Sequence, residues 1–299
     1  MYKKMLVGLD GSKLAEVVFT YAQELAARLN LTLDLIHVCG THETEQLPMH
    51  EAYIEHMAAE LQSKVEMIRS KIGGAHDKTV QVQGKIVVGY PAEEILKYAD
   101  ENSIDLIMIT SHGRSGIRMW DLGNVADKVI HAARVPVWLV PSELREEIIW
   151  DKLPKRVLVI PLDGSKLAEV AIPHAISIAK QRGGEGEIVL VYVGESVLDQ
   201  IVMGRSQLTQ IQTELLNVDK YLDEQVQRIS KEGITAHVET LTDNSPSAFI
   251  DYLKDNPTQL IVMGAHGYSG ISKIIFSGFT EQVVRLVKKT PILIVKPLE

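Results

Sequence analysis

The chain carries the same stretch twice: KMLVGLDGSKLAE at residues 4–16 and RVLVIPLDGSKLAE at residues 156–169. Each half then repeats two further segments: IDLIMITSHGRSG (104–116) matches TQLIVMGAHGYSG (258–270), and VPVWLV (135–140) matches TPILIV (290–295). A solenoid unit spans only about 20–50 residues, so a repeat of this length is a domain. We therefore expect two tandem domains, 1–141 and 155–299, joined by a charged linker at 142–154.

The composition excludes several classes of protein. With 299 residues, 45% of them hydrophobic and 23% charged, the chain is typical of a globular protein of about two domains. Its net charge of −8 and the lack of a basic stripe argue against a nucleic-acid partner. It has no apolar run of the roughly 20 residues that would span a bilayer, and its one cysteine cannot form an internal disulfide. We expect a cytoplasmic protein without a membrane partner.

Apolar, β-rich runs alternate with helical patterns in both halves. In the first half the runs lie at 5–9, 31–38, 80–89, 105–110 and 135–140, with helices expected at 13–30, 51–73, from Pro91 and at 124–133. The second half repeats this order. Near-continuous apolar strands alternating with helices predict an α/β, Rossmann-like fold in each copy: an open, mostly parallel five-stranded sheet with helices on both faces. The stretch 39–50 is expected to be irregular and to cover a site.

Ligands of such sheets bind beyond the carboxyl ends of the strands. In the first copy, Asp10 ends one strand, Val38 lies near the end of another, and a glycine loop from Gly113 to Gly123 leads into a helix. Glycine lets the backbone approach a phosphate, and a helix N-terminus offers unpaired N–H donors. An aspartate in this place can accept hydrogen bonds from a ribose. These features together suit a nucleoside polyphosphate.

The same residues resemble the universal stress protein family over essentially the whole chain, as a tandem pair with an adenine nucleotide alpha-hydrolase-like fold. Nucleotide-binding members show G-x2-G-x9-G-[S/T] after the fourth strand. The first copy has Thr110 in place of the first glycine and Asn124 in place of the final Ser/Thr, and the second copy reverses the final pair to Ser277-Gly278. The resemblance implies ATP or another adenine nucleotide, with or without Mg²⁺, in one or both repeats. It places the ligand at Leu9, Asp10, Val38, Ile109, Thr110, His112, Gly113, Arg114, Gly123, Asn124, Val125, Asp163, Val193, Met263, Gly264, His266, Gly267, Ser277, Gly278 and Phe279.

The resemblance also implies that the final strands, VPVWLV and PILIV, join the two copies as an internal pseudo-dimer, with a further homodimer left open. It implies stress-linked sensing or regulation through the bound nucleotide. The alternative is a protein-interaction module whose degenerate loops bind no nucleotide. We expect no enzymatic activity beyond slow ATP hydrolysis, because no acid, base or metal cluster converges in the sequence.

Other reactive side chains have simpler interpretations. Ser12 or Asp10 is expected to cap the first helix. Ser12 and Ser165 are expected to be helix caps rather than nucleophiles, because no G-x-S-x-G surrounds them. His112 and His266 are expected to lie near the ligand without transferring a proton. Three further histidines, His42, His50 and His56, lack H-E-x-x-H spacing, which favours a solvated loop over a metal site.

Overall fold

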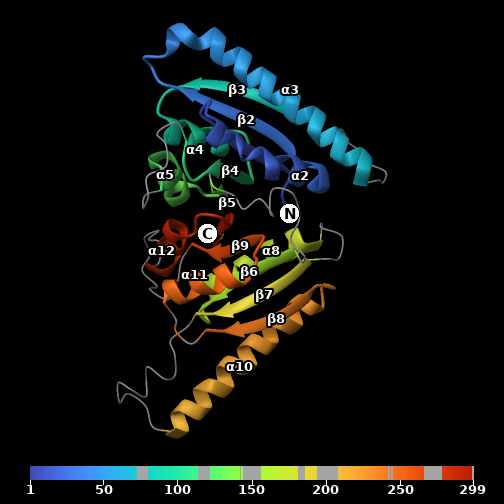
Figure 1. The fold of residues 1–299 in the computed structure, drawn as a ribbon, viewed down its shortest axis with the longest axis vertical. Coiled ribbons are helices and arrows are strands. Elements are labelled where there is room, and N and C mark those ends of the chain that lie inside the picture. Colours follow the sequence, from blue (N-terminus) through green and yellow to red (C-terminus); the bar gives the residue numbers. More distant parts are fainter. Residues whose placement is uncertain are drawn as a thin grey trace. The chain divides into compact units, whose positions relative to one another are not determined.

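The computed structural model describes residues 1–72, 80–113, 122–141, 143, 156–180, 186–193, 208–241, 243, 245–265 and 278–297, with the backbone alone for 208–215. The chain divides into two compact units, Met1–Ile149 and Trp150–Glu299. Each unit has the predicted α/β fold (Figure 1). Most of the expected linker lies outside the described residues, so its boundaries stay a prediction.

The first unit contains a five-stranded parallel sheet in the order β3-β2-β1-β4-β5. Along the chain its elements are β1 (Lys4–Leu9), α1 (Lys13–Glu16), α2 (Phe19–Leu29), β2 (Thr32–Cys39), the 3₁₀ turn η1 (Thr44–Gln46), α3 (Leu47–Ile72), β3 (Val82–Val88), α4 (Pro91–Glu101), β4 (Leu106–Thr110), α5 (Asn124–Ala132) and β5 (Val137–Val140).

The second unit repeats this arrangement, with the parallel order β10-β9-β6-β7-β8. Its elements are β6 (Arg156–Leu162), α7 (Lys166–Glu169), α8 (Ala171–Lys180), β7 (Gly186–Tyr192), α10 (Leu208–Ser230), β8 (Thr235–Thr240), α11 (Pro246–Asp255), β9 (Leu260–Gly264), α12 (Gly278–Leu286) and β10 (Ile292–Val295). The fold class predicted from the duplicated sequence is therefore confirmed.

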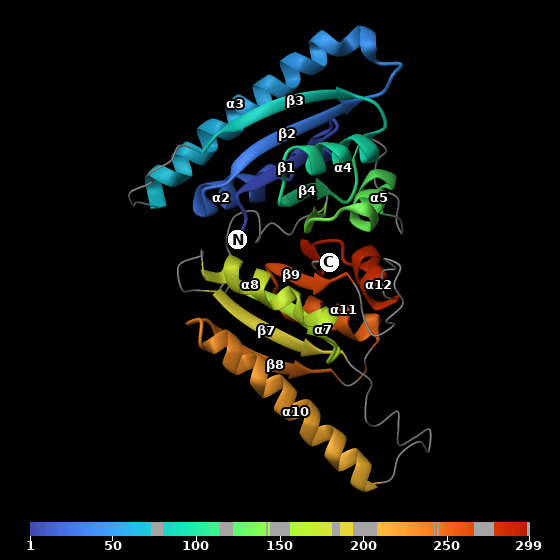
Figure 2. The same ribbon diagram turned by 180° about the vertical axis from the view of Figure 1, so that it is seen from behind.

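Helices cover both faces of the first sheet. In the first unit α2 packs against α3, which lies along β2 and β3, while α4 packs against α5 (Figure 2). The inner strands are almost fully buried: β4, which lies between β1 and β5, has no residue more than 9% exposed. This pattern explains the near-continuous apolar runs, since a parallel strand with helices on both sides has no solvated face.

Local chemistry decides where the helices begin. Ser12 is the cap of α1, because its Oγ accepts from the Ala15 N–H at 3.2 Å, and Ser165 caps α7 through the Ala168 N–H at 3.1 Å. These contacts confirm the cap interpretation of both serines. The helix expected at 13–30 is divided into α1 and α2. The expected irregular stretch 39–50 is shorter than predicted, because α3 already begins at Leu47, with a proline in its first turn.

No helix in the described part of the chain is long and apolar enough to cross a membrane. The pairing of the two final strands with each other stays a prediction from the sequence. Disulfide cross-linking between a cysteine placed in each strand, in a Cys39→Ser background, would test it.

Candidate functional site

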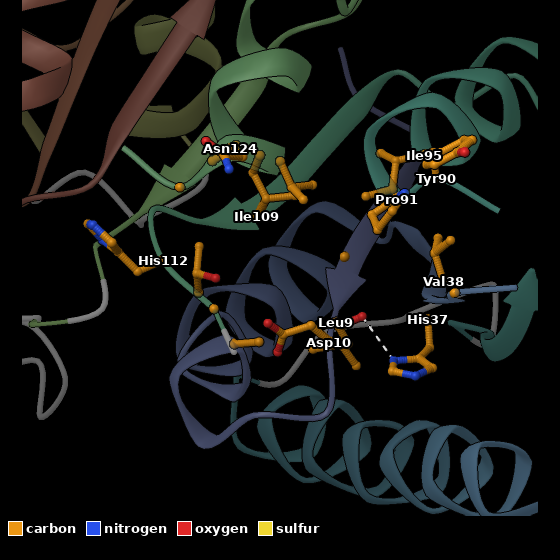
Figure 3. A pocket seen from close by; sticks show the side chains of 18 of the residues that line it. Leu9, Asp10, His37, Val38, Tyr90, Pro91, Ile95, Ile109, His112 and Asn124 are labelled. Carbon is orange, nitrogen blue, oxygen red and sulfur yellow. Dashed lines mark hydrogen bonds between the residues drawn. The ribbon is translucent and has the colours of Figure 1, made fainter. Parts of the chain in front are cut away.

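A cavity of about 540 Å³ opens where the strand order of the first sheet changes direction (Figure 3). β1 lies between β2 and β4, and the carboxyl ends of these three strands meet at the cavity. An open parallel sheet is expected to bind ligands at such a switch point. The lining residues are Gly8, Leu9, Asp10, Ala15, His37, Val38, Gly40, Thr41, His42, Glu43, Gly89, Tyr90, Pro91, Ile95, Ile109, Thr110, Ser111, His112, Gly113, Gly123, Asn124, Val125 and Ala126.

Asp10 is fixed at the end of β1 by its own turn. Its Oδ1 accepts from the Ser12 backbone N–H at 3.0 Å and from the Ser12 hydroxyl at 2.6 Å. The other carboxylate oxygen faces the loop after β4, where a Cβ added to Gly113 would lie 2.0 Å from Asp10 Oδ2. A side chain at 113 would therefore have to displace the carboxylate of Asp10.

Gly123 brings the loop after β4 against the start of α5. Its N–H donates to the Ser111 carbonyl at 2.8 Å, and a Cβ at this position would meet the same oxygen at 2.9 Å. Gly123 is the N-cap of α5 and, having no side chain, leaves the helix without a side-chain cap. The first turn of α5, including Asn124, therefore presents N–H groups and the positive end of the helix dipole at the cavity.

An apolar wall forms the other side of the cavity. It comes from β2, β4 and the first turns of α4 and α5, and its aliphatic members include Val38, Ile95, Ile109 and Val125. Tyr90 lies at the rim and is 73% exposed. Figure 3 shows Val38, Ile95 and Tyr90 on the opposite side of the cavity from the loop that carries His112. The cavity therefore has a flat apolar side and a polar, glycine-rich side.

The described lining carries more negative than positive charge. Its carboxylates are Asp10 and Glu43, and it includes neither lysine nor arginine within the described residues. Below it, the Tyr53 hydroxyl approaches Glu16 at 3.5 Å. Burial, with the neighbouring carboxylates of Glu16 and Asp10, raises the pKa of Tyr53 well above its usual range.

The histidines are arranged differently from the sequence-based expectation in one respect. His112 is buried, its Nδ1 lies 3.0 Å from the Ser111 hydroxyl, and its ring points away from Asp10 (Figure 3). His42 and His56 are exposed, as a solvated position requires. The expectation for His50 was wrong: it lies in α3, is 5% exposed and contacts His37. The sequence places His50 in a polar stretch, but α3 turns this residue toward β2.

All the first-repeat candidates that the structure describes lie together at the cavity: Leu9, Asp10, Val38, Ile109, Thr110, His112, Gly113, Gly123, Asn124 and Val125. Arg114 lies outside the described residues. Sequence reasoning missed the segment from Gly89 to Pro91 and the side chain of Ile95. The sequence did contain a signal for this segment. A glycine and a proline lie at the end of the strand predicted at 80–89, and that strand should end at the same carboxyl edge of the sheet as the other strands.

The second-repeat candidates are only partly described. Asp163 repeats the turn of Asp10, its Oδ1 accepting from the Ser165 N–H at 2.9 Å, and Val193 donates its N–H to the Leu162 carbonyl at 2.8 Å. Met263 is 2% exposed at the end of β9, and Gly278 begins α12. His266, Gly267 and Ser277 lie outside the described residues.

Two of the second-repeat candidates have packing roles. A Cβ at Gly264 would lie 2.5 Å from the Leu167 carbonyl, so glycine is needed there for the approach of α7 to β9. The ring of Phe279 packs against Phe249, with the ring centroids 5.7 Å apart. Phe249 is fully buried. The structure thus gives both residues a reason that does not involve a ligand.

Comparison with known proteins gives a consistent result. The model of the universal stress protein family matches residues 1–141 and 155–296. Universal stress protein YxiE of Bacillus subtilis is 33% identical over 147 residues, which cover 47% of this chain and 99% of the relative. Universal stress protein Rv2005c of Mycobacterium tuberculosis is 22% identical over 303 residues, covering 98% of this chain and 96% of the relative.

A solved structure has the same fold over the full chain. The crystal structure of a universal stress protein from Archaeoglobus fulgidus aligns with a TM-score of 0.67 at 21% identity, covering 98% of this chain and 96% of that one. Two family matches, one in each half, explain the internal repeat. The chain therefore belongs to the universal stress protein family and is a tandem member of it.

Proposed function

We propose that the first repeat binds an adenine nucleotide, ATP, in the cavity beside Asp10, and that the protein acts as a stress-response regulator through this retained ligand. The observation that carries the proposal is the contact between Gly113 and Asp10, which places a glycine backbone and a carboxylate side by side. Together with the first turn of α5, these groups can form hydrogen bonds with both the phosphates and the ribose of a nucleotide.

Each part of the ligand has a complementary part of the cavity. The aliphatic wall of Val38, Ile95 and Ile109 suits an adenine ring, which is flat and apolar on its faces. Asp10 can accept hydrogen bonds from the ribose hydroxyls. The N–H groups at the start of α5 can donate to the phosphates, for which Gly113 and Gly123 leave the backbone uncovered.

Direct detection of the ligand tests the proposal. Freshly purified protein would be denatured and its supernatant separated by chromatography, and ligand-free protein would be titrated with ATP by calorimetry, with and without Mg²⁺. We expect one equivalent of ATP per chain and weaker binding of GTP. A lack of both co-purified nucleotide and measurable heat would instead support the interaction-module alternative.

We also predict that turnover is slow or absent. A phosphoryl-transfer site needs a positioned base and cationic groups on the leaving phosphate, whereas the described lining offers neither lysine nor arginine, and the ring of His112 is directed away from Asp10. Phosphate release with Mg²⁺ should stay below about 1 per second. A faster rate that disappears in Asp10→Ala or His112→Ala would identify an enzyme instead.

At an ATP concentration 100 times Kd, binding should stabilise the folded repeat by about 2.7 kcal/mol.

A further inference from the structure

Three metal-ligating side chains form a buried cluster below the cavity. His37 and Cys39 lie on the same side of β2, two residues apart, and His50 comes from α3, which packs on that strand. The exposed fractions of the three residues are 2%, 0% and 5%. One ligand atom of each lies within 4.8 Å of the others.

The hydrogen bonds fix which nitrogen of His37 carries a lone pair. His37 Nδ1 lies 3.1 Å from the Leu9 carbonyl, drawn as the dashed line in Figure 3. A carbonyl only accepts, so Nδ1 carries the proton, and the Nε2 of a neutral His37 carries a lone pair. That lone pair is directed at His50, whose Nδ1 is 3.0 Å away. An imidazole held by a backbone carbonyl in this way is the usual second-shell arrangement of a metal-binding histidine.

The same reasoning leaves a lone pair on His50. Its Nδ1 donates to His37 Nε2, so Nε2 of the neutral ring is an acceptor. This atom is buried and has no hydrogen-bond partner among the described residues. A buried acceptor without a donor is costly, and apolar side chains would fill the same space without that cost. Core packing alone therefore does not explain this pair of imidazoles.

We propose that His37, Cys39 and His50 form a binding site for a borderline-soft d¹⁰ cation, with Zn²⁺ as the occupant. The ion would bind His37 Nε2, one nitrogen of the neutral His50 ring and the Cys39 thiolate. Its binding would replace the hydrogen bond between the two rings and release the thiol proton to solvent. Zinc binds imidazole nitrogen at about 2.0–2.1 Å and cysteine sulfur at about 2.3 Å, and a thiolate selects Zn²⁺ or Cu⁺ over Mg²⁺ and Ca²⁺. Three protein ligands leave one coordination position for water or a ligand. The site goes beyond the proposed nucleotide binding, since neither Cys39 nor His50 lines the cavity.

The site belongs to the first repeat. The strand register pairs Leu9 with His37 in one sheet and Leu162 with Tyr192 in the other, so a tyrosine stands where the second repeat would need this histidine. Cys39 is the only cysteine of the chain. The proposal therefore requires one metal ion per chain with a single thiolate ligand.

Titration with Co²⁺, followed by displacement with Zn²⁺, tests the site in the full chain without nucleotide. Metal-stripped protein at pH 7 should bind one equivalent of Co²⁺ and show thiolate-to-cobalt charge-transfer absorption, which only Cys39 can produce. Cys39→Ser should lose this absorption, and His50→Gln should weaken binding at least 10-fold.

His56→Gln is the matched control, because His56 lies on the exposed side of the same helix. It should leave both the absorption and the affinity unchanged. Circular dichroism of each variant checks folding, and if His50→Gln fails to fold, Cys39→Ser and Cys39→Ala carry the test. Absence of the charge-transfer band in the wild-type chain, or unchanged affinity in folded Cys39→Ser, would overturn the proposal.

Discussion

The two repeats place different side chains beside their last helices. Ile95 and Val125, on α4 and α5, line the cavity of the first repeat. The corresponding residues on α11 and α12 are Phe249 and Phe279, whose rings pack together with their centroids 5.7 Å apart. The aliphatic pair borders a cavity in one repeat, whereas the aromatic pair packs ring against ring in the other.

The correspondence rests on shared contacts. Ile95 and Phe249 each lie three residues before a tyrosine, Tyr98 or Tyr252. In both helices an asparagine side chain four residues further on donates to the carbonyl of that tyrosine at 2.9 Å. Val125 and Phe279 are each the second residue of their helices. The two repeats thus share the same helices and asparagine contacts, whereas the side chains at these two helix positions differ.

A second difference lies in the carboxylates of β2 and β7, Asp34 and Glu187, which stand at different positions of the strand register. Asp34 is fully buried and binds Lys4 Nζ at 2.7 Å, the Tyr98 hydroxyl at 2.9 Å and Gln83 Nε2 at 2.6 Å. Glu187, in the second repeat, instead contacts His237 at 2.9 Å, a side chain that is 43% exposed. Burial and the hydrogen bond to Asp34 raise the pKa of Tyr98 well above its usual range, so this tyrosine stays a donor.

The largest expected effect is on the stability of the second repeat. Phe249→Ala should lower the free energy of unfolding by about 3–5 kcal/mol, because it removes a fully buried ring from a packed pair. Ile95→Ala should cost nearer 2 kcal/mol, since that side chain already borders a cavity. Urea unfolding followed by circular dichroism would compare the two. Equal losses would mean that the repeats are packed alike at this edge.

Asp34→Ala should lower the free energy of unfolding by about 3 kcal/mol, because it removes the buried carboxylate that accepts from Lys4, Gln83 and Tyr98. Glu187→Ala removes a carboxylate at a different register position of the second repeat and should cost about 1 kcal/mol or less, since its histidine partner is 43% exposed. Thermal and urea denaturation would measure both. A greater loss of unfolding free energy in Glu187→Ala than in Asp34→Ala would contradict the greater stabilisation that we assign to Asp34.

Gly113→Val should weaken ATP binding at least 100-fold, about 2.7 kcal/mol, because the new side chain would collide with Asp10. Gly278→Val is the control in the other repeat, where an added Cβ meets no atom within 4 Å. Calorimetric titration of both variants, with folding checked by circular dichroism, decides which repeat binds. Loss of binding in Gly278→Val alone would assign the nucleotide to the second repeat.

The smallest expected effect is on ATP affinity, when the aromatic side chain of the second repeat is placed in the first. Ile95→Phe places in the first repeat the ring that the second repeat carries, and should weaken ATP binding about 10-fold by narrowing the apolar wall. Ile95→Leu, which keeps the volume, should bind almost as the wild type does. Unchanged affinity in Ile95→Phe would show that this wall does not contact the ligand.

The duplication, the succession of strands and helices along the chain, and the meeting of Asp10 with the glycine loop could all be predicted from the sequence. These features follow from local patterns, because buried parallel strands are apolar throughout and their carboxyl ends share one edge of the sheet. The same local signals identified Ser12 and Ser165 as caps, since a cap and its partner lie within one turn.

Only the tertiary structure decided which side chains meet across elements. His50 joins His37 and Cys39 because α3 packs on β2 with this residue turned inward, and Phe279 reaches Phe249 because α11 and α12 lie together. Gly264 likewise owes its place to the approach of α7 rather than to a ligand. Such contacts depend on how helices sit on a sheet, a long-range property that no local spacing in the sequence encodes.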